Sequence, residues 1–89
     1  MQIKKDFTIQ KIGSSYVAVP VGETSKSFHA MINLNETGAF IWKQLAEADR
    51  TEEELVEALL AEYDVAPEIA ARDVSRIVEI LRKNNIFIS

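Results

Sequence analysis

The sequence predicts an α+β fold: a three-stranded antiparallel sheet followed by three helices. Apolar and polar residues alternate in the first third of the chain, which is typical of half-buried strands. After Asn35 the apolar residues recur every three or four positions, as they do on the buried face of a helix. The last two helical segments are joined by a short turn, which favours a winged helix-turn-helix with the sheet as its wing.

The first two strands are expected to form a hairpin. Residues 7–12 begin with strict alternation, and residues 16–19 are aromatic, β-branched or small. Between them, Gly13 and two serines supply a turn, because glycine tolerates positive φ and serines hydrogen-bond locally. Pro20 lacks the N–H that a ladder needs, so regular pairing should end or bulge there.

Residues 28–34 are expected to form the third strand. Short connections favour an antiparallel meander of all three strands. Strand geometry places Phe28, Ala30, Ile32 and Leu34 on one face and His29, Met31 and Asn33 on the other.

Each helix has a recognisable start. Asn35 is the expected N-cap of the first helix, whose apolar stripe includes Trp42. Thr51 and Glu54 form the capping-box pattern at the start of the second helix. Pro67 suits the first position of the third helix, and Asn84-Asn85 should end it. Residues 86–88 then form a short extended tail.

Composition limits the classes of function. The 89 residues fit one domain spanning 1–89, and the absence of cysteine excludes disulfides and thiolate metal sites. No stretch approaches the about 18 to 20 apolar residues of a membrane span, and the N-terminus lacks a secretory signal, so we expect a cytoplasmic protein. The net charge is −4, and residues 47–62 hold seven acidic side chains against one arginine, which disfavours binding to nucleic acid.

The residues that catalysis requires do not come together in this sequence. The single histidine, His29, has no carboxylate at ligand-like spacing, and the three glycines are too scattered for a phosphate loop. The glutamates near residue 52 are best explained as a solvated, capping-assisted helix face. We therefore expect no catalytic residue, no metal site and no cofactor.

A helix-turn-helix also suggests DNA binding. The third helix would be the recognition helix, with Arg72, Arg76, Arg82 and Lys83 as its cations. Asp73 and Glu79 dilute that charge, and a DNA reader normally has a basic footprint. The sequence therefore leaves two possible functions open, an acidic DNA-associated regulator and an interaction module for an unrelated partner.

A series of short motifs runs through the chain in a characteristic order. An aromatic first strand is followed by Leu-Asn-x-Thr-Gly, Ile-Trp, Thr-x-Glu-Glu-Leu, an acidic-aromatic-Asp-Val link, a helix around Asp-Val and an apolar tail. In the same order, the residues that form these motifs are Phe7; Leu34, Asn35, Thr37 and Gly38; Ile41 and Trp42; Thr51, Glu53, Glu54 and Leu55; Glu62, Tyr63, Asp64 and Val65; Asp73 and Val74; and residues 86–88. In order and spacing the chain resembles the PqqD-like family, the peptide-binding modules known as RiPP recognition elements, over nearly its full length.

The resemblance implies a function. Members of this family have no known catalysis of their own; they bind the leader region of a ribosomally made precursor peptide and present it to a modifying enzyme, often a radical SAM protein. The leader would add as a strand to the edge of the third strand, in a groove shared with the third helix. The pathway need not be that of pyrroloquinoline quinone, and the protein would be a monomer or a weak, strand-swapped dimer. The peptide-binding residues expected from this geometry are Phe28, His29, Ala30, Met31, Ile32, Asn33, Arg72, Asp73, Arg76, Ile80 and Lys83.

Overall fold

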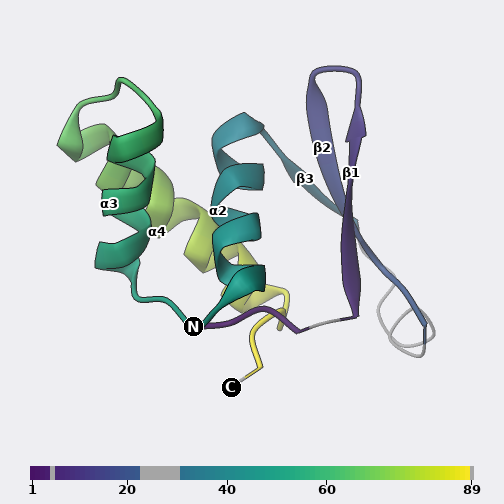
Figure 1. Ribbon diagram of the computed structural model, residues 1–89. Coiled ribbons are helices and arrows are strands. Elements are labelled where there is room, and N and C mark those ends of the chain that lie inside the picture. The colour runs from purple at the N-terminus through teal and green to yellow at the C-terminus, as the bar shows by residue number, and fades with distance from the viewer. Residues whose placement is uncertain (5, 23–30, 89) are drawn as a thin grey trace.

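The computed structural model describes residues 1–4, 6–22 and 31–88. Within these ranges three strands precede three helices, so the predicted α+β fold is confirmed (Figure 1). The strands are β1 (Phe7–Ile12), β2 (Ser15–Pro20) and β3 (Ile32–Leu34). The helices are α2 (Glu36–Glu47), α3 (Glu52–Glu62) and α4 (Pro67–Lys83).

The sheet is the predicted antiparallel meander, in the order β1-β2-β3. β1 pairs with β2 from Phe7 opposite Pro20 to Ile12 opposite Ser15, and Gly13 makes the turn with a φ of 63°. A side chain at that positive φ would be strained, which explains why glycine stands there. As predicted, Pro20 is the last residue of its strand.

The third strand is shorter than predicted in the part that the structure describes. β3 begins at Ile32, which pairs with Ala18, and Met31 lies outside it. Continuing the same register would place Met31 opposite Val19 and then bring Pro20 into the ladder. Proline has no N–H to donate, which weakens any ladder continued beyond Val19. The predicted strand residues Phe28, His29 and Ala30 lie outside the described residues.

The three helix starts follow the predicted local chemistry. The Oδ1 of Asn35 accepts a hydrogen bond from the backbone N–H of Gly38 at 2.8 Å. In the capping box, the backbone N–H of Thr51 donates to Glu54 Oε1 at 2.9 Å, and the Glu54 N–H donates to Thr51 Oγ1 at 3.2 Å. Pro67 is the first residue of α4. These contacts satisfy backbone donors that a helix start otherwise leaves unpaired.

One hydrophobic cluster connects the sheet with the helices. α2 lies between the sheet and the α3–α4 pair (Figure 1), and its Trp42 meets Phe7 of β1 edge-on, with ring centroids 6.0 Å apart. The most deeply buried large side chains are Ile41, Leu45, Leu55, Leu59, Val74, Val78, Leu81 and Ile86. No helix in the described ranges is both long and apolar enough to cross a bilayer.

The two ends of the described chain lie side by side, which the sequence patterns do not predict. Ile3 and Phe87 form an isolated antiparallel bridge. The Lys4 N–H donates to the Ile86 carbonyl at 3.0 Å, and the Ile88 N–H donates to the Gln2 carbonyl at 3.0 Å. The extended tail after α4 is therefore held by the segment that precedes β1 (Figure 1).

Candidate functional site

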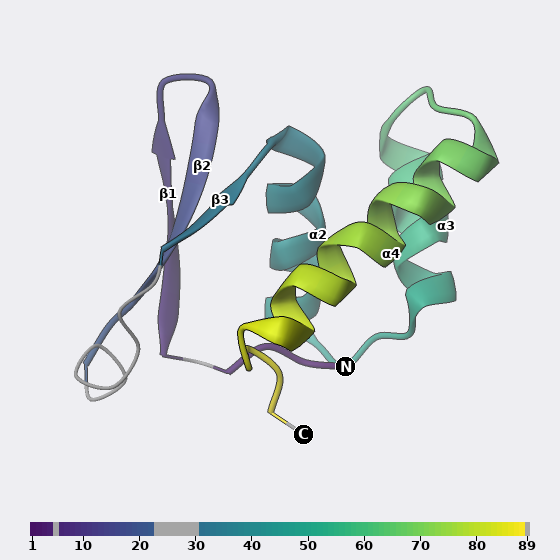
Figure 2. The ribbon, with the colours of Figure 1, turned by 180° about the vertical axis from the view of Figure 1, so that it is seen from behind.

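β3 is an edge strand. The strand order places β2 on one side of it, and in the described ranges no strand pairs with its other side. An edge strand presents backbone N–H and C=O groups that an extended peptide can satisfy. Figure 2 shows that β3 and α4 are exposed on the same side of the molecule.

Alternation along β3 separates its structural side chains from its accessible ones. Ile32 and Leu34 are buried in the core, with exposed fractions of 5% and 4%. Asn33 is exposed, and Met31, just before the strand, keeps 66% of its surface exposed. The edge is therefore anchored by its inward side chains, while Met31 and Asn33 are free to contact a ligand.

Gly38 of α2 packs closely against both α4 and the end of β3. A Cβ at Gly38 would lie 3.1 Å from Ile77 Cδ1 of α4 and 3.3 Å from Leu34 Cδ2 of β3. Glycine is needed here for close packing rather than for a special backbone angle. Because Ile77 and Leu34 converge on one point, the flank of α4 that includes Ile77 is the flank turned toward β3.

Three of the five predicted α4 residues accompany Ile77 on that flank. Asp73 lies four positions before Ile77 and Ile80 three positions after it, so both are its neighbours on the helix; Arg76 is in turn a neighbour of Asp73 and Ile80. Asp73 and Ile80 are half-buried, whereas Arg76 is exposed. Arg76 Nη2 lies 3.9 Å from Asp73 Oδ1, a weak ion pair that a ligand carboxylate can compete with.

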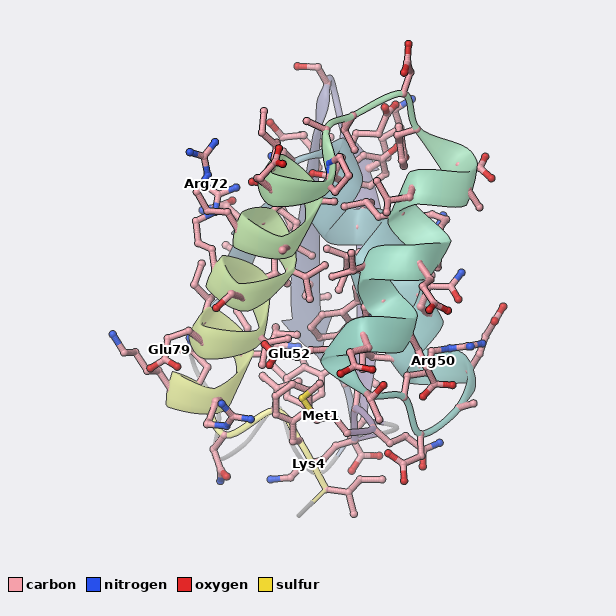
Figure 3. All side chains as sticks on the ribbon, turned by 90° about the vertical axis from the view of Figure 1, so that its left-hand side faces the viewer. Met1, Lys4, Arg50, Glu52, Arg72 and Glu79 are labelled. Carbon is pink, nitrogen blue, oxygen red and sulfur yellow. The ribbon has the colours of Figure 1, made fainter. Side chains whose placement is uncertain are left out.

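The other two predicted residues, Arg72 and Lys83, face further outward. Both are exposed, and Figure 3 shows Arg72 on the outer side of α4, away from α3. Around the helix axis, Arg72 lies about 100° from Asp73, and Lys83 lies about 60° from Ile80. They therefore add positive charge beside the flank of α4 that is turned toward β3, and they are not part of that flank.

Ile69 is an apolar residue that the sequence interpretation missed. It lies four positions before Asp73 and seven before Arg76, so it continues the same helical row. Its side chain is 42% exposed, unlike the buried Ala70 beside it. The i, i+4, i+7, i+11 spacing of Ile69, Asp73, Arg76 and Ile80 was a signal in the sequence that would have identified it.

The chemistry of this surface suits recognition. The described residues contain no group of three or more histidine, cysteine, aspartate or glutamate side chains able to hold a metal ion. The surface instead combines an open strand edge, two isoleucines at different depths and the charges of Asp73 and Arg76. It can bind an extended chain and read a few of its side chains.

Comparison with known proteins agrees with this geometry. The family model described as Coenzyme PQQ synthesis protein D (PqqD) matches residues 16–86. The chain belongs to the PqqD family. The matched range includes the sheet from β2 onward and all three helices, so the resemblance predicted from the sequence motifs is confirmed. No match was found among curated proteins.

Two solved structures resemble this PqqD-family chain over most of its length. TbiB1 in complex with the TbiA(beta) leader peptide has a TM-score of 0.72 and 25% sequence identity, covering 100% of this chain and 96% of that one. Lasso peptide synthetase B1 complexed with the leader peptide has a TM-score of 0.67 and 21% identity, covering 96% of this chain and 93% of that one. The second likeness supports the fold alone.

Proposed function

We propose that this chain binds the leader region of a ribosomally synthesised precursor peptide and presents it to a peptide-modifying enzyme. The observation that carries the proposal is the full-length likeness to TbiB1, a protein solved with a leader peptide. The open edge of β3 supplies the physical means, because the leader can add as a further strand.

Backbone pairing alone is too weak for useful affinity. About five added hydrogen bonds at roughly 0.5–1.5 kcal/mol each contribute only a few kcal/mol. Micromolar binding requires about −8 kcal/mol. Side-chain contacts must supply the difference, and the exposed part of Ile69 and the accessible part of Ile80 offer apolar area for it.

Charge then selects the register of the leader. Arg76, with Arg72 and Lys83 further out, favours a leader that has a carboxylate near an aliphatic residue. The ion pair between Asp73 and Arg76 is weak, so a leader carboxylate can replace Asp73 as the partner of Arg76. We expect Met31 and Asn33 to contact leader side chains.

The chain acts in this proposal as a non-catalytic domain, residues 1–89, that works in trans in the cytoplasm. The partner enzyme is a radical SAM protein or another enzyme that modifies peptides. The free protein is a monomer or a weak, strand-swapped dimer, and leader binding competes with the dimer because both use the open edge of β3.

Isothermal titration calorimetry with the leader of a precursor encoded beside this chain's gene tests the proposal. We expect a one-to-one complex with micromolar or tighter affinity, and the same leader with its residues scrambled is the matched control. Equal affinity for the true and scrambled leaders would contradict specific recognition. Absence of any binding would contradict the function itself.

A further inference from the structure

A second concave surface lies between α3 and α4. Its cavity has a volume of about 450 Å³, and its apolar lining comes from Val56 of α3 and from Ala71 and Val74 of α4. Val74 is fully buried beneath it, Val56 is half-buried and Ala71 is exposed. We call this surface the α3–α4 groove.

Glutamates of α3 line one side of the α3–α4 groove. Glu52, Glu53 and Glu57 line it, and all three are exposed. Figure 3 views this face and shows Glu52 between the two helices. The ion pairs found among the described residues involve other acidic side chains, namely Asp49, Glu47 and Asp73.

The needs of the helix explain only part of this arrangement. Acidic residues in the first turn of α3 stabilise its positive dipole end, which accounts for Glu52 and Glu53. Glu57 lies beyond that turn, yet it lines the same groove. Capping and dipole effects also give no reason for an open apolar floor between the helices.

The α3–α4 groove is separate from the β3 edge. Successive residues of a helix are about 100° apart around its axis, so Ala71 and Asp73 lie about 200° apart, on opposite flanks of α4. Ala71 lines the α3–α4 groove, whereas Asp73 belongs to the flank turned toward β3. A leader on the β3 edge therefore leaves the groove open.

We propose that the α3–α4 groove docks a basic amphipathic segment of the peptide-modifying enzyme. Lysine or arginine side chains would lay their aliphatic stems over Val56 and Ala71 and direct their charges to Glu52, Glu53 and Glu57. The positive charge of the partner follows from the composition of residues 47–62, which contain seven acidic side chains and one arginine. This excess of negative charge attracts cations over a distance. This inference rests on the proposed function, since it assigns the enzyme its own surface.

The test uses the full chain, the purified modifying enzyme encoded beside it and the precursor leader. E52Q/E53Q/E57Q removes the rim charge while keeping side-chain size. Ser75→Arg places a cation of the chain itself at the groove, because Ser75 is an exposed lining residue. E62Q/D64N/E79Q removes three exposed acids that do not line the groove, and is the matched control. Sedimentation velocity measures the enzyme complex, and calorimetry measures leader binding.

We expect the triple variant and Ser75→Arg each to weaken enzyme binding by roughly tenfold at low salt, with little change in the control. Leader affinity should stay at the wild-type value in every variant. Docking is refuted if the wild-type chain does not bind the enzyme, if the control weakens it equally, or if the groove variants affect only self-association of the chain. Failure of the leader to bind the wild-type chain would instead contradict the proposed function. Enzyme binding is measured in a separate experiment, so the two failures can be distinguished.

Discussion

Gly38 of α2 and Ile77 of α4 are so closely packed that a Cβ on the glycine would lie 3.1 Å from the isoleucine Cδ1. The same Cβ would lie 3.0 Å from Asn35 Oδ1, the atom that caps α2. Leu34 of β3 lies 3.3 Å from the same Cβ position, so α2, α4 and the end of β3 meet at this glycine. The packing beside the proposed binding surface therefore depends on Gly38.

Gly38→Ala should destabilise the fold despite the better helix propensity of alanine. Propensity favours alanine by about 1 kcal/mol, whereas overpacking typically costs about 1–3 kcal/mol. We expect a net loss of about 1 kcal/mol in urea unfolding, together with weaker leader binding. Ile77→Val removes Cδ1, so in the double variant it should recover part of the loss. An increase in the stability of the Gly38→Ala variant would show that Ile77 and Leu34 can move aside for the added methyl group without cost.

Met31→Pro should weaken leader binding far more than Met31→Ala. Proline removes a backbone donor and fixes φ, so an added strand loses ladder bonds, whereas alanine removes only the exposed side chain. We expect roughly tenfold or greater loss for proline by calorimetry, with melting temperatures close to wild type because Met31 lies outside β3. Equal effects of the two substitutions would indicate that side chains carry recognition.

Ile69→Ala and Ile80→Ala should reduce leader affinity to different extents. Full burial of an isoleucine by the peptide is worth up to about 2 kcal/mol, and the loss should appear in calorimetry. Ile80 packs against the core cluster, so its substitution should also lower stability in thermal melts. Ile69 is more exposed and is the cleaner probe of binding. Wild-type affinity in both folded variants would place the peptide elsewhere.

Arg76→Glu should weaken leader binding most strongly at low ionic strength, because an exposed charge is screened by salt. Arg82→Glu makes the same charge change on another side of α4 and serves as the control. We expect the difference between the two variants to shrink as salt is raised in calorimetric titrations. Identical losses for both would point to net charge rather than to a specific contact.

Tyr63 should make the fold sensitive to alkaline pH. Burial, followed by the nearby charges of Glu36 and Glu62, raises the pKa of its hydroxyl above the ordinary value of 10.0. The fold therefore favours the neutral phenol, and this stabilisation is complete below pH 10.0 and is lost as pH rises through the folded-state pKa. Tyr63→Phe keeps the edge-on contact with Phe40 and should show a smaller alkaline decline in urea melts. An unchanged decline would assign the effect to other groups.

Duplex DNA should not bind at physiological ionic strength. Binding to DNA gains from counterion release when a protein brings positive charge to phosphates, but this chain has a net charge of −4. Fluorescence anisotropy with labelled duplexes over a salt series is the measurement. A salt-sensitive, sequence-dependent signal would favour the DNA-associated alternative instead.

The sequence by itself determined the features that depend on neighbouring residues. Helix starts at Asn35, Thr51 and Pro67 follow from hydrogen bonds or backbone limits within a few positions. The alternation of buried Ile32 and Leu34 with exposed Asn33 follows from strand geometry. Such rules act along the chain, so they can be applied before any tertiary contact is known.

Only the tertiary structure decided which surfaces lie together. The bridge between Ile3 and Phe87 joins segments at opposite ends of the sequence, and the close approach of Gly38 to Ile77 joins α2 to α4. The pairing of β3 with residues 16–18 of β2 is likewise a contact between separate segments of the chain. Periodicity identifies the buried face of a helix, but packing partners decide which flank of α4 meets β3 and which meets α3.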